Sequence, residues 1–246
     1  SLAGKNLRSF NNEAKPIKYT IGAGHLDVDF SSNSQTAKSS TTTVDYLAIA
    51  IPLGKFGAGF GLLPYSSVGY KLQSSDADDV VQYKYRGEGG LNKVFLGVGY
   101  QLTNDLRLGV DASYNFGNIK NTNIAFGYNS EGNLLQYQSR ESNRSDLGGF
   151  TYNFGIIYSK LIKSNLEVMA SATYSPSSQI TSTNSRAFST IVIDPSTQQE
   201  FTINALDVDL SALNLETTEL TLPSKTSFGF GVGAPRKWFA GVEYTI

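Results

Sequence analysis

The residues from Asp105 to Gly117 alternate strictly between two kinds of side chain. A period of two indicates a β-strand, because successive side chains leave a strand on opposite faces. One face of this strand is apolar and the other is small, polar or charged. The apolar face would pack on the core of a soluble sandwich, or would meet lipid around a wet lumen in a membrane barrel. The apolar positions are Leu106, Leu108, Val110, Ala112, Tyr114 and Phe116.

The composition favours the membrane fold. Charged residues make up 17% of the chain, against about 25% in a typical soluble domain. The 24 glycines, 14 tyrosines and 14 phenylalanines suit strands with aromatic girdles at the borders of a lipid-facing band. No apolar run reaches the roughly 18 residues that a spanning helix needs. The absence of cysteine excludes disulfides, and the balance of 20 basic against 21 acidic residues argues against nucleic acid as a partner.

The same alternation recurs in about nine to ten stretches, and the connections between them alternate in length. Because alternate connections of an up-and-down meander lie at opposite ends, one end carries only tight turns and the other only long loops. This asymmetry is typical of outer-membrane barrels, with short periplasmic turns and long extracellular loops. The tight turns lie near 52–55, 103–105, 162–165 and 233–236, and the long polar connections near 31–43, 73–92, 118–149 and 176–225.

The sequence therefore predicts an all-β fold, an antiparallel up-and-down transmembrane β-barrel that forms a single domain over 1–246. Residues 1–15 have no clear period and are expected to be irregular. The segment 176–225 is expected to be a long extracellular loop with short strand-like pieces at 189–193 and 200–203. A change of apolar parity predicts a bulge at Gly24–His25, and residues 124–137 read as a small hairpin.

Two glycine-rich stretches carry a resemblance to a known family. Gly87–Tyr100 (GEGGLNKVFLGVGY) and Pro52–Tyr70 resemble segments of FadL/OMPP1/TodX-like outer-membrane proteins from Bacteroidetes-type bacteria, and Lys237–Tyr244 and Ser1–Gly4 are similar to further pieces of them. The resemblance implies a fourteen-stranded monomeric barrel with an N-terminal plug, which passes hydrophobic compounds such as fatty acids. One branch of that family serves the type 9 secretion system. With about nine strands readable here, we expect either more strands or a partial chain.

The candidate site residues are few, and most have a plain structural alternative. Charged and polar residues on the non-apolar strand faces would line the lumen, as ion pairs or as a polar wall: Arg107, Asp111, Asn115, Glu167 and Glu243. Gly57, Gly59, Gly61 and Pro64 would kink a strand, which in the resembled family opens a lateral exit, or would only follow the barrel's curvature. His25 has no serine motif beside it. The acidic residues Asp76, Asp78, Asp79, Asp207 and Asp209 suit solvated loops better than a Ca²⁺ site. The sequon Asn143–Ser145 reads as a chance match.

The main functional hypothesis is passive transport of hydrophobic small molecules across the outer membrane. The alternative is an outer-membrane barrel that acts as an interaction or secretion-system component, in which segment 176–225 packs on a partner through Phe188, Ile191, Val192 and Ile193. A soluble secreted β domain is the third possibility, and an enzyme is the last, because no acid, base and nucleophile converge. We expect membrane lipid, lipopolysaccharide and a hydrophobic solute as partners, with a protein partner in an outer-membrane complex as the alternative hypothesis requires. We expect no nucleic acid, cofactor or metal.

Overall fold

The computed structural model describes residues 17–31, 36–163, 166–234 and 237–246, although not the side chains of Leu26, 28–31 and 36–44. The described part consists of twelve strands and one short 3-10 helix, η1, at Ser211–Leu213. No helix within those ranges is long and apolar enough to cross a membrane. The strands are β1 (Lys18–Ser31), β2 (Thr36–Leu53), β3 (Phe56–Ser75), β4 (Val81–Gln101), β5 (Leu106–Ala125), β6 (Gln138–Lys163), β7 (Leu166–Ser175), β8 (Ser178–Ile193), β9 (Glu200–Asp207), β10 (Thr217–Leu222), β11 (Lys225–Ala234) and β12 (Trp238–Thr245).

All pairings are antiparallel, and the sheet follows the order of the chain from β1 to β7 before it continues to β11 and β12. β7 and β8 pair with successive stretches of β6, on either side of Pro176, so together they occupy one position in the sheet. β9, β10 and β11 likewise share the next position, against β8 and β7. Three of the twelve strands therefore extend another strand, which leaves nine positions. This agrees with the nine to ten strands read from the sequence.

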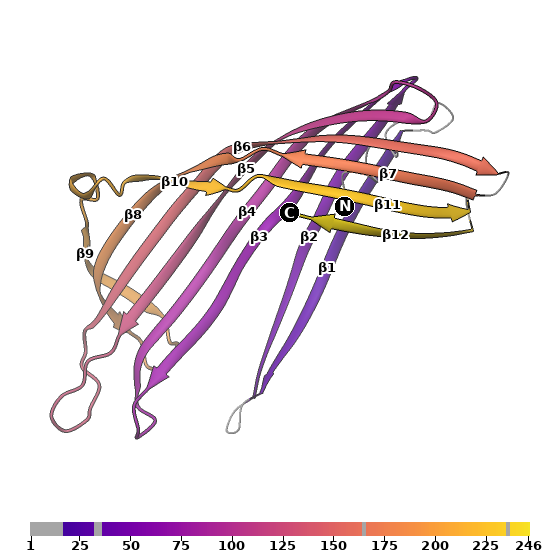
Figure 1. Cartoon of the computed structure of the whole chain (residues 1–246). Helices are drawn as coiled ribbons and strands as arrows, with labels where there is room; N and C mark the ends of the chain where they lie inside the picture. Colours follow the sequence, from indigo (N-terminus) through magenta and orange to yellow (C-terminus); the bar gives the residue numbers. More distant parts are fainter. Residues whose placement is uncertain (1–16, 32–35, 164–165, 235–236) are drawn as a thin grey trace.

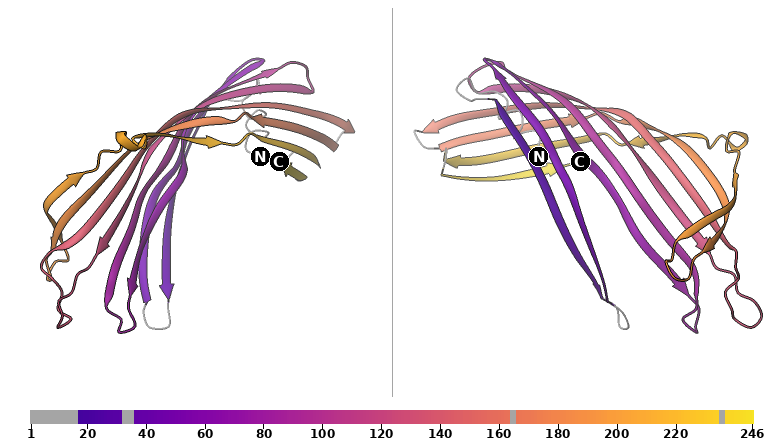
Figure 2. Two further views of the ribbon diagram at one scale, coloured as in Figure 1. Left: turned by 60° about the vertical axis from the view of Figure 1, so that its left-hand side comes forward. Right: turned by 180° about the vertical axis from the view of Figure 1, so that it is seen from behind.

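The sheet is strongly curved and twisted (Figures 1 and 2). Its two margins are β1 and β12, and within the described residues each pairs on one side only, with β2 and β11. The all-β, antiparallel, up-and-down fold predicted from the sequence is confirmed. The sheet is open and is consistent with a barrel.

The apolar faces of the strands point away from the protein. On β5, Leu108, Val110 and Tyr114 are 39%, 44% and 42% exposed, whereas Ser113 and Asn115 between them are 1% and 0% exposed. A sandwich in water would show the reverse, because burial of apolar surface drives its folding. Exposed apolar faces around polar side chains are the arrangement expected of an outer-membrane barrel, whose outer solvent is hydrocarbon.

The long polar connections predicted from the sequence are much shorter than expected. β3 and β4 are joined by 76–80 and β5 and β6 by 126–137, because the strands continue through most of 73–92 and 118–149. The prediction that 31–43 is a loop is also wrong, since β2 begins at Thr36. Apolar alternation marks only the part of a strand that faces lipid, whereas backbone pairing continues where both faces are polar. The small hairpin is present, with a bridge between Tyr128 and Leu134.

Segment 176–225 is not a loop either, because it contains β8, β9 and β10. The strand-like pieces predicted at 189–193 and 200–203 lie at the end of β8 and the start of β9. The bulge expected at Gly24–His25 occurs two residues earlier, between Gly22 and Ala23, where Asp45 is the extra residue on β2.

A row of glycines crosses the sheet and divides it into two regions. Gly90 on β4 and Gly117 on β5 have φ angles of 153° and 157°. A Cβ on Gly117 would lie 2.1 Å from the carbonyl oxygen of Gly90, and one on Gly90 would lie 2.3 Å from that of Ser66, so no side chain fits at either position. On β3 the row meets a register shift between Pro64 and Ser66.

We call the region on the tight-turn side of this glycine row the belt (56–64, 92–116, 149–163, 166–175, 225–234 and 237–246). The region beyond it is the polar end (65–91, 117–148 and 178–222). In Figure 1 the belt lies at the upper right and the polar end at the lower left. The buried positions on β5 change across the row from odd to even numbers, from Ser113 and Asn115 to Thr122 and Ile124. The pairing with β4 and β6 nevertheless continues without a shift. The side of the sheet that is covered therefore differs between the two regions.

Candidate functional site

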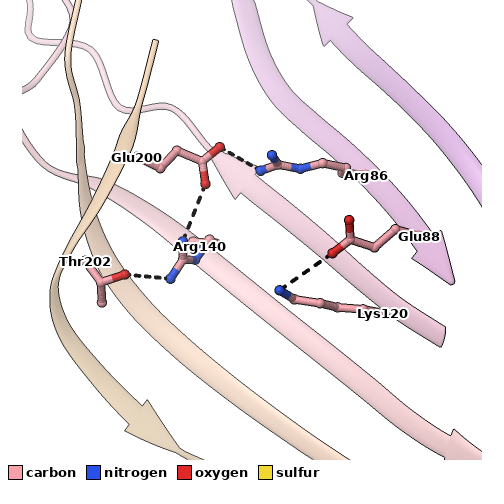
Figure 3. A network of polar contacts seen from close by, with 6 residues as sticks. All are labelled: Arg86, Glu88, Lys120, Arg140, Glu200 and Thr202. Atoms are coloured by element: carbon pink, nitrogen blue, oxygen red, sulfur yellow. Dashed lines mark hydrogen bonds and ion pairs between the residues drawn. The ribbon is translucent and has the colours of Figure 1, made fainter. Parts of the chain in front are cut away.

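The polar end contains a charged cluster that joins three strands (Figure 3). Arg86 Nη2 on β4 donates to Glu200 Oε1 on β9 at 2.6 Å, and Arg140 Nη1 on β6 lies 3.4 Å from Glu200 Oε2. Arg140 Nη2 also donates to Thr202 Oγ1 at 2.8 Å. The side chains of Glu200 and Arg140 are 20% and 21% exposed, so this shared carboxylate is partly shielded from water.

The contact between Arg86 and Glu200 shows how far the polar end curls. The strands between them follow the order β4, β5, β6, β8, β9. Four strand spacings of about 4.8 Å would separate the two backbones by about 19 Å in a flat sheet, which is too far for a 2.6 Å contact between these side chains. The sheet therefore bends until β9 faces β4, as the curved path of β8 and β9 in Figure 2 shows.

The curled polar end encloses a small core. Ile124 on β5 and Ile191 on β8 are 2% and 0% exposed. Gln138, also buried, accepts a hydrogen bond from the Gly127 amide through Oε1 at 2.7 Å and donates from Nε2 to the Leu135 carbonyl. The curl is thus held by apolar contacts and by the hydrogen bonds of Gln138, whereas Nε of Arg140 in the charged cluster is buried without a hydrogen-bond partner.

Other charges of the polar end are paired as well. Lys120 Nζ lies 3.8 Å from Glu88 Oε1, also seen in Figure 3, and Arg186 Nη2 lies 2.7 Å from Glu141 Oε1. Arg186 also lies over the ring of Phe188, 5.1 Å from its centroid. These pairs are partly exposed, so each contributes little to stability by itself, but together with the Glu200 pairs they neutralise Arg86, Lys120, Arg140 and Arg186.

Three of the five lumen-lining candidates lie together on the inner face of β5. Arg107 Nη1 donates to Ser159 Oγ at 3.0 Å, and Asp111 Oδ1 accepts from Asn153 Nδ2 at 2.9 Å. The amide of Asn115 donates to Thr151 Oγ1 on β6 at 3.1 Å. Side-chain hydrogen bonds therefore join β5 and β6 on the inner face of the belt.

The other two lumen-lining candidates lie on other strands. Glu167 on β7 pairs in register with Gly233, and Glu243 on β12 pairs with Gly229. Strand alternation through these registers puts both on the same face of the sheet as Asp111. The five candidates thus share a face of the sheet and lie on three strands, β5, β7 and β12.

The kink candidates on β3 have a packing explanation at one position. Gly61 leaves room for the ring of Phe95 on β4, since a Cβ there would lie 2.6 Å from a ring carbon. Gly57 and Gly59 are buried opposite Gly99 and Gly97. Pro64 does not interrupt β3, and Tyr65 beside it is the residue that the register skips.

The acidic loops contain hydrogen-bonded turns. Asp76 Oδ1 accepts the amides of Val80 and Asp78 at 2.9 and 3.0 Å, and the first of these bonds is the main cause that lowers the pKa of Asp76. The side chain of Ser211 donates to Asp209, and this hydrogen bond is the main cause that lowers the pKa of Asp209. Asp78 and Asp79 lie within the first turn, and Asp207 ends β9. Within the described ranges, no group of three His, Cys, Asp or Glu residues could hold a metal ion.

His25 and the sequon also have local partners. His25 Nε2 lies 3.3 Å from Asp27 Oδ1 on the exposed side of β1. Asn143 Nδ2 donates to Glu141 Oε1 at 2.9 Å. Arg86, Arg140 and Glu200 could not be identified from the sequence, because they come from three distant stretches that meet only through the curl of the sheet.

The family of the chain follows from a comparison with protein-family models, in which the BamG model matches residues 2–246. The chain belongs to the BamG family. BamG is a family of outer-membrane proteins related to the BAM complex, so the location expected from the sequence, the outer membrane, agrees with this membership. None of the curated proteins or solved structures in the comparison matches the chain.

The resemblance to FadL/OMPP1/TodX-like proteins is wrong, because the BamG match covers the stretches on which it was based. The geometry explains why those stretches misled. A Cβ on Gly87 would lie 2.1 Å from the ring of Tyr70, and one on Gly89 would lie 2.1 Å from the Asn118 carbonyl oxygen. The glycines of this motif thus serve the packing of this sheet. The fourteen strands, the plug and the lateral exit were implications of that resemblance and are withdrawn with it.

Proposed function

We propose that this BamG-family protein is a non-catalytic outer-membrane subunit that works by binding protein partners in the BAM complex. The observation that carries the proposal is the BamG match over 2–246. It favours an interaction component over transport, and nothing in it supports the uptake of hydrophobic compounds.

The two regions of the sheet fit this role. The exposed apolar faces of the belt would anchor the protein among membrane lipids, with lipopolysaccharide around the outer rim. The polar end would then stand outside the hydrocarbon, where charged and hydrogen-bonding side chains can meet another protein. Its ion pairs and its small buried core, around Ile124 and Ile191, keep that surface in one shape, which lowers the entropy lost on binding.

The inner face of the belt supports the same preference. A channel for a greasy solute would need an apolar lining, whereas Ser113 and Asn115 are buried polar side chains, and Asn115 donates to Thr151. Such bonds are typical of side chains that hold strands together. We therefore infer a structural role for Arg107, Asp111 and Asn115.

Co-purification tests the proposed function. The full-length protein, tagged and expressed at its native level, is extracted from outer membranes in a mild detergent and purified through the tag. We expect the components of the BAM complex, identified by mass spectrometry, to co-purify in a fixed ratio that a second size-based separation preserves. Recovery of the protein alone, together with reduced fatty-acid uptake by a deletion strain, would contradict the proposal and favour transport.

A further inference from the structure

β9 and the residues after it form an apolar surface at the margin of the polar end. Phe201, Ile203 and Leu206 on β9 are 49%, 58% and 67% exposed. Leu213 and Leu215 in the following excursion are exposed too. The sequence led us to expect a partner surface from Phe188 to Ile193. Phe188 on β8 is 45% exposed, but Ile191 points into the core, and further exposed apolar residues lie on the next strand, β9. We call residues 200–216 the β9 edge.

The backbone of β9 is paired on one side only. Within the described part of the chain, β9 pairs with β8 and with no other strand. An exposed apolar edge strand attracts other strands, and soluble proteins usually protect such an edge with lysine or with a covering loop. The β9 edge has no lysine, and a register shift leaves Ile203 opposite no residue of β8. On either side of this bulge the unpaired side of β9 can accept a strand from a partner.

The β9 edge lies in a segment where all charges are negative. No Lys or Arg occurs between Arg186 and Lys225, while this segment contains Asp194, Glu200, Asp207, Asp209, Glu216 and Glu219. The chain as a whole has a net charge of −1, so charge is strongly segregated here. Glu200 is neutralised by Arg86 and Arg140, whereas Asp207, Asp209 and Glu216 border the apolar residues.

The Glu200 pairs also fix β9 in place. Two arginines from β4 and β6 hold the first residue of the strand, and Thr202 accepts a further hydrogen bond from Arg140. A partner that binds here would meet a strand that is already ordered, so little conformational entropy would be lost.

We propose that the β9 edge docks an extended strand of a BAM-complex protein, a segment of apolar residues bordered by Lys or Arg. This inference rests on the proposed function and adds the site and the chemistry of the partner. The partner strand would pair with the open side of β9, as in other cases of strand addition. Its cations would meet the acidic border, which favours rapid and specific association.

The same charges disfavour two other occupants. Anionic lipid headgroups would be repelled by Asp207, Asp209 and Glu216. A second copy of this chain would offer few cations from its own polar end, because Arg86, Lys120, Arg140, Arg144 and Arg186 already pair there with acidic residues of the same chain, which leaves Lys71 and Lys84.

The double variant Ile203→Asp/Leu206→Asp tests the site in the full-length protein. We expect the co-purified BAM components to fall at least tenfold, with the amount of the variant in the outer membrane unchanged. The matched control is Leu134→Asp/Tyr137→Asp, which changes two residues of similar exposure, 51% and 53%, in the 126–137 connection. The control should keep its partners within twofold. Undiminished co-purification of the β9 variant, while the wild type also co-purifies, overturns the docking site and leaves the proposed function intact. A wild type that brings down no BAM component overturns both.

Crosslinking keeps the site testable if the double variant fails to accumulate. Because the chain has no cysteine, a single Ile203→Cys substitution can carry a thiol-linked photocrosslinker in intact outer membranes. We expect adducts with a BAM component, at a strand whose neighbours include Lys or Arg. An adduct at twice the mass of this chain, which contains only its own peptides, or adducts with lipid alone, would overturn the proposal.

Discussion

Strands β3 to β6 run through both the belt and the polar end, yet the two regions expose and bury opposite kinds of side chain. Along β5, the belt exposes Val110 and buries Asn115, whereas the polar end buries Ile124 and exposes Asn118. The register with the neighbouring strands is unbroken between these two stretches. The comparison shows that one continuous ladder can serve two solvents, and that side-chain pattern and the glycine row determine where one ends and the other begins.

The largest effect is expected at the boundary between the two regions. Gly117→Ala places a Cβ 2.1 Å from the Gly90 carbonyl oxygen at a φ of 157°, so the backbone of β4 or β5 has to move, and we expect a loss of at least about 4 kcal/mol in unfolding free energy. Urea unfolding in lipid vesicles, followed by tryptophan fluorescence from Trp238, would measure it. Gly69→Ala is the control, since nothing lies within 4 Å of its Cβ and the φ is ordinary. Equal stability of the two variants would contradict a boundary role for the glycine row.

A charge on the outer face separates the two regions directly. Val110→Lys places an ammonium group among lipid chains if the belt spans the bilayer, and should cost about 2–4 kcal/mol. Asn118→Lys, eight residues further on the same strand, should change stability by less than about 0.5 kcal/mol, because that position meets water. The same unfolding titration measures both, and similar losses for the two variants would show that the boundary is misplaced.

The charged cluster should have a smaller and more local effect. Glu200→Gln keeps the shape of the side chain but removes the charge shared by Arg86 and Arg140, which should cost about 1–2 kcal/mol after allowance for partial exposure. Hydrogen exchange should rise in β9 first and leave β5 unchanged. In the control Glu88→Gln, the lost partner is Lys120 at 3.8 Å, and the glutamate is 65% exposed, so we expect no change in exchange. An unchanged β9 in Glu200→Gln would mean that the curl does not depend on this carboxylate.

The smallest effect concerns the 76–80 connection and its dependence on pH. The pKa of Asp76 is lowered from 3.8, first of all by the hydrogen bond from the Val80 amide. A lowered pKa in the folded state means that the stabilising contribution is present above pH 3.8 and disappears as the pH falls through the folded-state value. Protection of the Val80 amide, followed by NMR, should therefore decline only in strong acid. Asp76→Asn should abolish this dependence and Asp78→Asn should keep it. Loss of protection of the Val80 amide near neutral pH in the wild-type protein would contradict this prediction.

The belt could be predicted from the sequence and the polar end could not. Residues such as Leu108 and Tyr152 alternate with polar ones because one face meets hydrocarbon, so hydrophobic period alone identifies the strand and its outward face. Beyond Gly117 both faces are polar, so the hydrophobic period of two disappears. The sequence therefore predicts loops where the structure has strands. The same loss of signal hid β8, β9 and β10 within 176–225.

The charged cluster could not be predicted from the sequence for a different reason. Arg86, Arg140 and Glu200 come together only because the sheet curls, and curvature arises from glycines and register shifts that carry no distance information in the sequence. The glycine-rich motif at Gly87–Tyr100 carries the resemblance to another family. In the structure, Gly87, Gly89 and Gly90 are required because the ring of Tyr70 and two neighbouring backbones approach them closely.

The two margins of the sheet, β1 and β12, run in the same direction because the sheet has nine positions. In an alternating meander the first and ninth positions have the same sense, so β1 and β12 both ascend toward the polar end. All paired strands in the described part of the chain are antiparallel. If β1 and β12 paired directly with each other, that pair would be parallel, with slanted and evenly spaced hydrogen bonds. Only an odd number of intervening strands would let the wall close with the alternating polarity it has elsewhere.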